Sequence, residues 1–325
     1  MPTLLVSTTG GHLAQLVELA DRLPRDGDGE RVWVTHDNAQ SRSLLSGETA
    51  VYVPYVGVRD VTGVIRSIPV AHHVRSKRRP TRVVSTGSGI ALGYLPYLAA
   101  RGVRAHYIES AARVSGPSVS GRLLRSIPGV RLYTQYRRLA SRTWRYGGSV
   151  FDGFAPVDVP EPVALRRVVV TLGTADEFCF RRLLDRLEPL LGAGGSLERE
   201  QATPVETLWQ TGATPTDGLR ISARPWLPAR ELEAAMAAAD VVVSHAGAGS
   251  ALTALRAGRC PVLVPREAAR GEIGDDHQEQ LGRELEERGL ALLRRVEDLT
   301  LDDLRRAAAR RLERAVEPPT FELAP

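Results

Sequence analysis

The sequence predicts an α/β protein with two Rossmann-like domains, each built on a parallel sheet. Short β-branched runs, such as residues 168–172 and 239–243, alternate with patterns typical of amphipathic helices. Several runs end at a glycine-bearing turn that opens a helix, as in a βαβ unit. The 325 residues suffice for two cores. Glycines and prolines gather between residues 147 and 166, so we predict domains over 1–150 and 167–325 and a linker over 151–166.

The composition narrows the class of protein. Hydrophobic residues make up 43% of the chain, which is typical of a globular protein. No run of about 18 apolar residues occurs, so we expect no membrane-spanning helix. The chain enters a strand pattern at once, without the basic region of a signal peptide. Cys179 and Cys260 lack metal-type spacing, so we expect free thiols in a reducing compartment, the cytoplasm.

Charge is unevenly distributed along the chain. Residues 1–155 hold 21 basic and 10 acidic side chains, a net charge of +11, whereas the remainder holds 22 and 28, a net charge of −6. Between residues 61 and 151 there are 16 basic residues and one carboxylate, Glu109. Such a face suits an anionic bilayer or a diphosphate-bearing acceptor, or is simply solvated. Nucleic acid ranks last, because no DNA-binding motif is visible.

The first strand, over residues 3–8, leads into a glycine turn and an amphipathic helix over 13–23. Gly10 and Gly11 allow a ligand to approach the backbone. His12 is predicted in the first helical turn, at the carboxyl edge of the sheet. The helix dipole there favours a neutral imidazole, the form that accepts a proton, although a lone histidine can also be structural.

Residues 61–79 combine apolar side chains with a basic end, Arg75 to Arg79. We expect Pro69 to interrupt a continuous helix. The pattern predicts an interfacial segment on an anionic membrane. The alternative is a surface helix with basic residues at its C-terminus, where the dipole favours them.

A second glycine turn, Gly87-Ser88-Gly89, follows a strand over residues 82–85. Its spacing is not the dinucleotide fingerprint, so it better suits the phosphates of an acceptor or donor. The next strand, over 104–108, ends at Glu109, followed by Arg113. We predict that Glu109 acts as the general base or orients His12, unless an arginine merely neutralises it.

The predicted second domain repeats this design. A strand over residues 168–172 ends in Gly173-Thr174, another places Gly212 at its end, and a third runs into residues 244–253, SHAGAGSALT. The first amides of a helix have no internal partners, and the dipole there favours an anion. Gly247 and Gly249 would let a diphosphate come close, with a hydroxyl from Ser250; tight packing is the alternative reading.

A further strand over residues 260–265 is followed by residues 275–280, DDHQEQ, which open a helix. Neighbouring ends of a parallel sheet face one crevice. We therefore expect Asp276, His277 and Gln278 to lie beside a polyhydroxylated ring attached to the phosphate. Asp275-Asp276 and the polar loop Asp26-Gly27-Asp28 form no metal motif, so no metal or other cofactor is predicted.

The run SHAGAGSALTALRAGRCPVLVP, with DDHQEQLGRELEERG after it, resembles the donor-binding half of GT-B glycosyltransferases. The nearest resemblance is to the lipid II-forming N-acetylglucosaminyltransferase and to the two-subunit transferase that adds the second sugar to dolichol-diphospho-GlcNAc. STTGGH resembles the acceptor-facing loop of these enzymes, YIESAARVSGPSVSGRLL one dolichol-pathway subunit, and VVVTLGT the start of the other. The chain thus resembles both subunits fused, with two parallel sheets facing a central cleft.

The resemblance implies a role for each quoted position. Thr253 stands where relatives often carry an acidic residue for the ribose hydroxyls. The predicted catalytic residues are His12 and Glu109. The predicted donor-binding residues are Gly173, Thr174, Gly212, Ser244, His245, Ala246, Gly247, Ala248, Gly249, Ser250, Thr253, Asp276, His277 and Gln278. The predicted acceptor-binding residues are Gly10, Gly11, Gly87, Ser88, Gly89 and Arg113.

The function this predicts is inverting, metal-independent transfer of a sugar from a nucleotide-sugar donor, UDP-linked, to a polyprenyl-diphosphate-linked acceptor. The protein would act as a peripheral protein at the cytoplasmic face of the membrane, in polysaccharide or glycolipid synthesis. Two alternatives stay open: a soluble natural-product glycosyltransferase, which needs no basic membrane surface, and a non-catalytic nucleotide-binding partner protein, consistent with Thr253.

Overall fold

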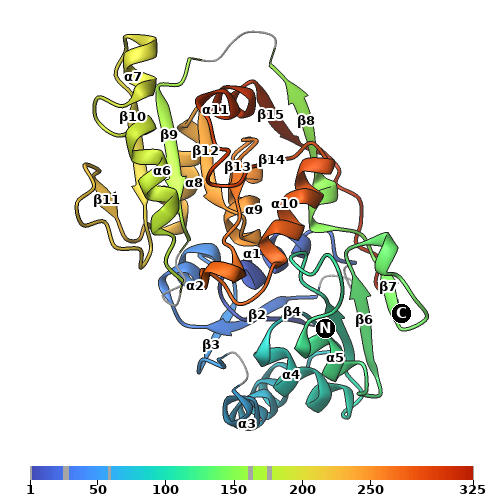
Figure 1. The fold of residues 1–325 in the computed structure, drawn as a ribbon. Coiled ribbons are helices and arrows are strands. Elements are labelled where there is room, and N and C mark those ends of the chain that lie inside the picture. Colours follow the sequence, from blue (N-terminus) through green and yellow to red (C-terminus); the bar gives the residue numbers. More distant parts are fainter. Residues whose placement is uncertain (1, 25–28, 58–59, 160–163, 174–177, 325) are drawn as a thin grey trace. The chain divides into compact units, whose positions relative to one another are not determined.

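The computed structural model describes residues 2–24, 29–57, 60–159, 164–173 and 178–324. The chain divides into two compact units, which are treated separately below. Unit 1 comprises Met1–Asp152 and Glu317–Pro325, and unit 2 comprises Gly153–Val316 (Figure 1). Strand β8 (Phe154–Asp158) lies inside the predicted linker, and the last nine residues belong to unit 1 and not to the predicted second domain.

Unit 1 contains a parallel sheet of order β3-β2-β1-β4-β5-β6-β7. Its buried strands are rich in Val and Leu because both faces of a parallel sheet are covered by helices. The elements are β1 (Thr3–Ser7), α1 (Gly11–Ala20), β2 (Arg31–His36), α2 (Ala39–Leu44), β3 (Ala50–Val53), α3 (Val61–Arg78), β4 (Arg82–Gly87), α4 (Gly89–Ala99), β5 (Arg104–Ile108), α5 (Val119–Leu124), β6 (Val130–Thr134) and β7 (Trp144–Tyr146).

Unit 2 contains a second parallel sheet, of order β11-β10-β9-β12-β13-β14. This is the strand order 3-2-1-4-5-6 of a Rossmann fold, and the first six strands of unit 1 have it too. The elements are β9 (Arg167–Thr171), α6 (Arg181–Leu191), α7 (Ser196–Gln201), β10 (Glu206–Gln210), β11 (Ala223–Arg224), α8 (Ala229–Ala238), β12 (Val241–His245), α9 (Ala248–Arg256), β13 (Val262–Val264), α10 (His277–Glu287), β14 (Leu292–Leu293), α11 (Leu301–Ala308) and β15 (Arg310–Arg314).

Two segments depart from local expectation. Helix α3 runs through Pro69 without a break. Proline leaves the carbonyl of Ile65 without its intrahelical donor, but this residue is 60% exposed, so water can replace the lost bond. The sequence pattern predicts an amphipathic helix over residues 301–316, but the helix ends at Ala308, because β15 then pairs antiparallel with β8.

The C-terminal segment is anchored in unit 1. Phe321 is fully buried, and its ring lies 6.0 Å from the Tyr133 ring, centroid to centroid. Its backbone N–H donates to the carbonyl of Arg22 at 2.8 Å. The buried guanidinium of Arg22 in turn donates to the carbonyls of Pro319 and Ser149, at 2.8 and 2.7 Å. The proline-rich end is therefore part of the folded unit, where the sequence suggests fraying.

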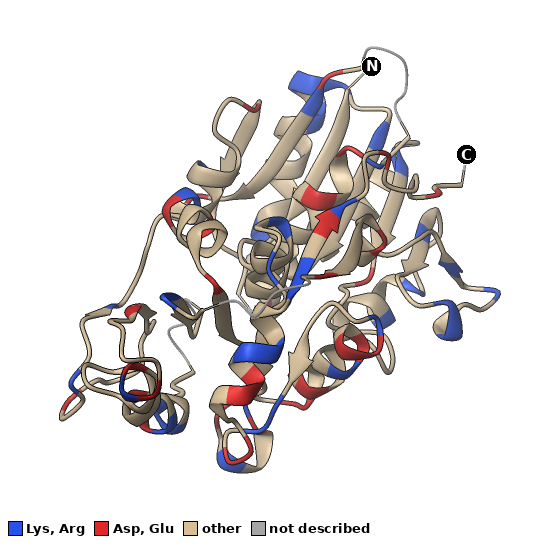
Figure 2. Cartoon of the chain, turned by 90° about the horizontal axis from the view of Figure 1, so that it is seen from above, with Lys and Arg blue, Asp and Glu red and all other residues tan. Residues whose placement is uncertain are grey.

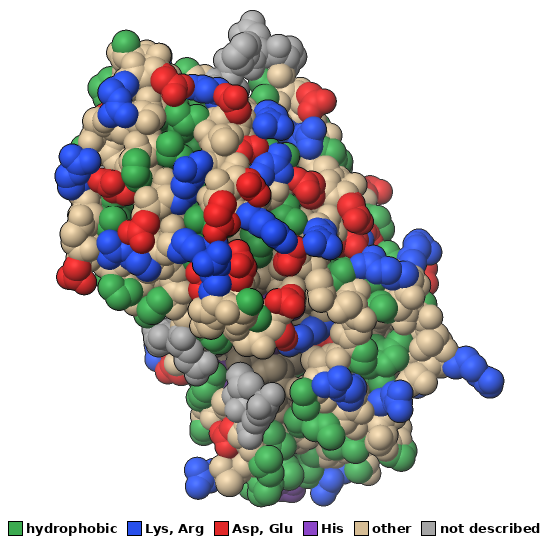
Figure 3. Space-filling model, viewed as in Figure 1, with side chains coloured by type: hydrophobic (Ala, Val, Ile, Leu, Met, Phe, Trp, Pro, Cys, Tyr) green, Lys and Arg blue, Asp and Glu red, His purple; other side chains and the backbone are tan. Residues whose placement is uncertain are grey.

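Charges on unit 2 are mixed. Basic and acidic positions are marked in Figure 2, and the two signs interleave over the face of unit 2 that Figure 3 shows. Many form ion pairs, such as Arg283 with Glu279 at 2.6 Å and Arg224 with Glu231 at 2.7 Å. Such exposed pairs contribute about 0–1 kcal/mol each, so they add little to the stability of unit 2.

A buried histidine makes unit 1 sensitive to acid. His106 on β5 is fully buried, and its Nδ1 lies within hydrogen-bond distance, 3.0 Å, of the Tyr133 hydroxyl. Burial, with Arg131 nearby, lowers the pKa of His106 to about 3, whereas an unfolded histidine has a pKa of about 6.5. The unfolded chain therefore binds the proton first, so the stabilisation present above about pH 6.5 is lost as the pH falls towards 3.

We expect His106→Gln to flatten this dependence, because a glutamine amide can hydrogen-bond the tyrosine hydroxyl in either direction and does not titrate. Between pH 6.5 and 5 the free energy of unfolding of the wild type should fall by about 2 kcal/mol more than that of the variant, at about 1.4 kcal/mol per pH unit. Urea unfolding at both pH values measures this. Equal losses in the two proteins would mean that His106 does not cause the sensitivity.

Candidate active site

In unit 2 the strand order reverses between β9 and β12, and ligands of open α/β sheets bind at the carboxyl ends of such strands. Strand β9 ends just before Gly173, and β12 ends at His245, just before Gly247. Both turns come directly from adjacent, hydrogen-bonded strands, with Ser244 opposite Thr171. The predicted glycines Gly173 and Gly247 thus lie at neighbouring strand ends.

The His245 ring fills the space beside both glycines. A methyl group on Gly173 would lie 2.6 Å from Cε1 of His245, and one on Gly247 would lie 2.9 Å from Cδ2. Gly173 also has a φ of +78°, which L side chains rarely adopt. Burial, with Arg266 nearby, lowers the pKa of His245 to about 3, so the ring is neutral at pH 7. His245 therefore fixes the shape of both turns without adding charge.

Helix α9 begins at this point and presents its first amides. Gly247 is its N-cap and has no side chain to cap them. The first intrahelical bond of the helix runs from the Ala251 N–H to the Gly247 carbonyl, so the N–H groups of residues 248–250 precede it. Gly247, Gly249 and Ser250 are partly exposed, whereas Ala246 and Ala248 are buried. The exposed positions are those predicted to hold a diphosphate.

Other predicted donor residues are engaged within the protein. The buried Ser244 hydroxyl donates to the His245 carbonyl at 2.9 Å. Thr253 donates its hydroxyl to the Gly249 carbonyl at 3.0 Å, within its own helix. Gln278 is 3% exposed, and its Oε1 accepts the Arg266 N–H at 3.0 Å. These side chains shape the backbone around the site.

The remaining predicted donor residues lie on turns. Gly212 follows β10 with a φ of +59° and donates its N–H to the Pro225 carbonyl at 2.9 Å. His277 begins α10, its Nδ1 bonds to the Asp275 carboxylate, and Asp276 is the N-cap. Thr174 lies outside the described residues.

Arg266 is a residue at this edge that the sequence patterns did not single out. Its side chain is buried, and Nη2 donates to the carbonyls of Leu172 and Phe178 at 2.8 and 3.1 Å. Burial lowers its pKa to about 10, so it stays charged at pH 7. Through Gln278 it joins the ends of β9 and β13 to the start of α10. Its position two residues after β13, at the carboxyl edge, is the signal that could have identified it.

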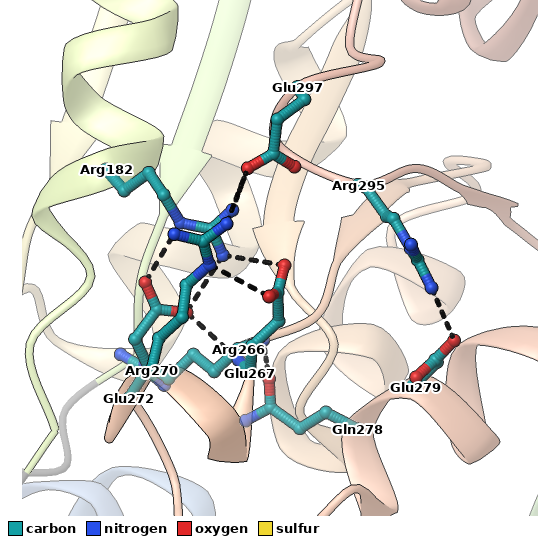
Figure 4. A network of polar contacts seen from close by, with 9 residues as sticks. All are labelled: Arg182, Arg266, Glu267, Arg270, Glu272, Gln278, Glu279, Arg295 and Glu297. Carbon is teal, nitrogen blue, oxygen red and sulfur yellow. Dashed lines mark hydrogen bonds and ion pairs between the residues drawn. The ribbon is translucent and has the colours of Figure 1, made fainter.

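An arginine-centred network holds the loop between β13 and α10 (Figure 4). Arg182 on α6 contacts Glu267, Glu272 and Glu297 at 2.9, 3.1 and 2.5 Å. The Glu272 carboxylate also accepts the Glu267 N–H at 2.9 Å. The loop that leads to Asp276 is thus fixed to the helix that follows β9.

We expect Arg182→Met to loosen this loop. Removal of the shared cation leaves partly buried carboxylates together, so the free energy of unfolding of unit 2 should fall by about 1–3 kcal/mol. The matched control is Arg181→Met. Arg181 pairs with Asp185 on the surface, so this substitution should lower the free energy of unfolding by less than about 1 kcal/mol. Chemical denaturation compares the two; equal costs would contradict a positioning role for Arg182.

In unit 1, His12 lies at the switch point between β1 and β4. Its Nδ1 lies 2.6 Å from the Thr86 carbonyl oxygen. A carbonyl can only accept, so Nδ1 carries a proton, and Nε2 is the ring nitrogen that could accept one from a substrate. A methyl group on Gly87 would lie 3.2 Å from the ring. The structure thus holds His12 in the tautomer of a general base.

Glu109 is 3% exposed and is surrounded by donors. Oε1 accepts the Tyr107 hydroxyl and the Ser110 N–H at 3.2 and 3.0 Å. Oε2 accepts the N–H and hydroxyl of Ser118 at 2.9 and 3.0 Å. Burial raises the pKa of Glu109, although these bonds oppose the rise. The carboxylate therefore holds the segment between β5 and α5. Tyr107 links it to the edge near His12, because a methyl group added at Gly87 would lie 3.5 Å from the Tyr107 hydroxyl.

The predicted acceptor glycines are partly engaged. The Gly10 N–H donates to Gln40 at 2.6 Å. The Ser88 N–H donates to the Thr8 hydroxyl at 3.0 Å. Gly89 begins α4, Gly11 begins α1, and Arg113 lies in the turn after Glu109, where its N–H donates to the Ser110 carbonyl.

Two buried glutamine side chains that the sequence patterns did not single out support the carboxyl edge of the unit 1 sheet. Gln15 on α1 donates to the Ser110 hydroxyl at 3.1 Å and accepts the Ala111 N–H at 2.7 Å. Gln135, after β6, donates to Gln15 at 3.2 Å and to the Glu109 carbonyl at 3.0 Å. A polar residue on the apolar face of a predicted helix, as at Gln15, is the available signal.

Two kinds of feature are absent from the described residues. No three His, Cys, Asp or Glu side chains there are grouped so that they could hold a metal ion. Within the same residues, no helix is both long and apolar enough to cross a bilayer.

One family model matches part of unit 2. Residues 208–316 match the model of the glycosyltransferase family 28 C-terminal domain. No curated protein matches the chain.

Solved structures of glycosyltransferases match nearly the whole chain. MurG of Acinetobacter baumannii is 16% identical, with 94% of this chain and 89% of that chain covered and a TM-score of 0.56. SnogD of Streptomyces nogalater is 19% identical, with 95% and 90% covered and a TM-score of 0.58. SsfS6 of Streptomyces sp. SF2575, complexed with thymidine diphosphate, is 20% identical, with 95% and 90% covered and a TM-score of 0.53. The fold is α/β with two Rossmann-like domains, GT-B, and the comparisons together support a glycosyltransferase.

Proposed function

We propose that this protein transfers a sugar from a nucleoside-diphosphate sugar to a polyprenyl-diphosphate-linked acceptor, with inversion and without a metal ion. The observation that carries the transfer is the pair of glycine turns in unit 2, formed around His245 beside the partly exposed first turn of α9. Peptide N–H groups at a helix N-terminus suit a diphosphate. SsfS6, solved with thymidine diphosphate, has a similar fold, so thymidine and uridine donors both belong in the test.

In the proposed reaction, His12 of unit 1 acts on the acceptor, and the start of α9 in unit 2 acts on the donor. The acceptor hydroxyl gives its proton to Nε2 of His12 as its oxygen bonds to the anomeric carbon. The bond between that carbon and the diphosphate oxygen breaks, and the electron pair leaves with the nucleoside diphosphate. The N–H groups of residues 248–250 stabilise the charge that grows on the leaving group. Attack opposite the leaving group inverts the anomeric configuration. Asp276 and His277 would orient the sugar.

The experiment is a donor panel. Purified protein is incubated with UDP- and TDP-sugars and a polyprenyl-diphosphate acceptor, with and without a chelator, and nucleoside diphosphate release is measured. We expect release that needs acceptor and persists with chelator, and a product of inverted configuration by NMR. Release from no donor would contradict transfer, and loss with chelator would contradict the metal-independent mechanism.

An apolar surface on unit 1 favours a membrane-bound acceptor. Val61, Ile65 and Ile68 are 69%, 60% and 38% exposed and lie on one face of α3. On α5, Val119 and Leu123 are 51% and 55% exposed. Figure 3 shows hydrophobic side chains gathered over this region. With the basic residues of unit 1, the surface suits the cytoplasmic face of an anionic bilayer.

We expect Ile65→Gln combined with Leu123→Gln to weaken binding to anionic vesicles by about tenfold or more, because each removes roughly 1 kcal/mol of apolar insertion. The control is Val316→Gln, which is 99% exposed but lies on neither helix. Vesicle sedimentation measures the change. The other candidate, a natural-product transferase, is suggested by the similar folds of the glycotransferase of kitacinnamycin and the spinosyn forosaminyltransferase SpnP. Unchanged vesicle binding, with activity towards a free small acceptor, would favour it.

A further inference from the structure

A wide hollow of about 770 Å³ opens at the edge of the unit 1 sheet opposite to His12. Strands β4 and β5 begin there, at Arg82 and Arg104, whereas His12 lies where β1 and β4 end. Four arginines line it: Arg75 and Arg79 at the end of α3, Arg101 just after α4, and Arg104 at the start of β5. None of them takes part in the proposed sugar-transfer chemistry.

The hollow is strongly cationic. The residues that line it include no carboxylate. Within the described residues, no ion pair joins Arg75, Arg79 or Arg101 to an acidic side chain, whereas the neighbouring Arg78 lies 3.7 Å from Glu30. Two helices end here, and each C-terminus contributes about −0.5 of a charge. Against the three guanidinium groups of Arg75, Arg79 and Arg101 alone, the net charge stays near +2.

Part of the wall is ordered before any ligand binds. The Arg101 guanidinium lies 3.7 Å from the centroid of the Tyr97 ring, and its Nη1 donates to the Tyr97 carbonyl at 3.2 Å. The Tyr97 hydroxyl contacts Nδ1 of His72 at 2.7 Å, which ties α4 to α3. The Arg79 N–H donates to the Arg75 carbonyl at 2.8 Å and so caps the C-terminus of α3. A ligand therefore has less side-chain entropy to remove.

We propose that this hollow is a binding site for a phosphate-bearing anion of two or more negative charges. Guanidinium groups match phosphate oxygens in bidentate geometry, and several of them around one hollow favour a diphosphate over a single phosphate. Free pyrophosphate and the headgroup of an anionic phospholipid share this chemistry. The site is separate from the diphosphate site of unit 2, so it does not depend on the proposed sugar transfer.

The test uses the full chain and two probes. Inorganic pyrophosphate is titrated by calorimetry at low and moderate salt, and vesicles with and without phosphatidylglycerol are sedimented with the protein. The variant is Arg75→Gln with Arg101→Gln. The matched control is Arg66→Gln, an exposed residue of α3 that does not line the hollow. Thermal unfolding confirms that each variant is folded.

We expect the double variant to weaken binding at least tenfold, in a salt-sensitive manner, and Arg66→Gln to leave it within about twofold. An effect on pyrophosphate identifies a free phosphate as the ligand, and an effect on vesicles alone identifies the lipid headgroup. Any pyrophosphate binding that survives the double variant belongs to another site. No effect on either probe, or an equal effect of Arg66→Gln, would overturn the proposal.

Discussion

Replacement of His12 by alanine is expected to lower kcat by about 100-fold or more, with little change in the KM for the donor. General-base catalysis contributes roughly 10²–10⁴-fold, and the Thr86 carbonyl holds His12 in the tautomer that this role requires. Steady-state kinetics with a UDP- or TDP-sugar, whichever the donor panel identifies, measures the effect. The control is His73→Ala, an exposed histidine on α3.

The pH dependence separates His12 from Glu109. If His12 is the base, the acidic limb of the kcat/KM profile should vanish in His12→Ala and persist in Glu109→Gln. The Glu109 variant should instead lose stability, since an amide cannot accept all four hydrogen bonds of the carboxylate. Full turnover in His12→Ala would show that the base lies elsewhere.

Replacement of Gly247 by valine is expected to weaken nucleoside diphosphate binding by about 100-fold. The backbone at Gly247, with φ −88° and ψ 137°, accepts a side chain, so the effect comes from the collision with the His245 ring. That collision displaces the first turn of α9, where the diphosphate is proposed to bind. Isothermal titration with UDP and TDP measures the change. The control is Gly274→Ala, where an added methyl group meets nothing within 4 Å.

A second substitution tests the cause. In the Gly247→Val background, His245→Ala removes the ring that the valine meets, so it should restore at least part of the lost affinity. Two residues in contact are expected to couple in this way. If the double variant binds as weakly as Gly247→Val alone, the ring does not hold the turn, and the explanation fails.

Local sequence patterns are enough to predict many strands of the two sheets and the glycine turns that follow them. The run 239–243 and the glycines after it predict a strand, a turn and a helix, and β12 and α9 have this form. The end of α11 could not be predicted in this way, because β15 forms only where β8, about 150 residues earlier, supplies a partner. Helix α3 tolerates Pro69 because Ile65, one turn earlier, is exposed to water, and this exposure cannot be predicted from the local sequence.

The sequence predicts those parts of the site that depend on backbone conformation, such as the glycine turns. The sequence predicts close approach of a ligand at Gly247 and donor binding at Gly173, but only the folded chain shows that His245 is the neighbour of both. Arg266 and Gln15 were missed because their importance depends on partners from distant segments, Leu172 for one and Ser110 for the other.

The anchoring of Phe321 has a consequence for how the gene can be divided. In chain order, unit 2 is an insertion within unit 1, entered at Gly153 and left at Val316. A fragment that stops at residue 152 would expose the surface around Gly147 and Tyr133 that the tail covers, and Arg22 would lose its Pro319 partner. An independently folding acceptor half would have to be made as a circular permutant, or with its tail rejoined by a short linker.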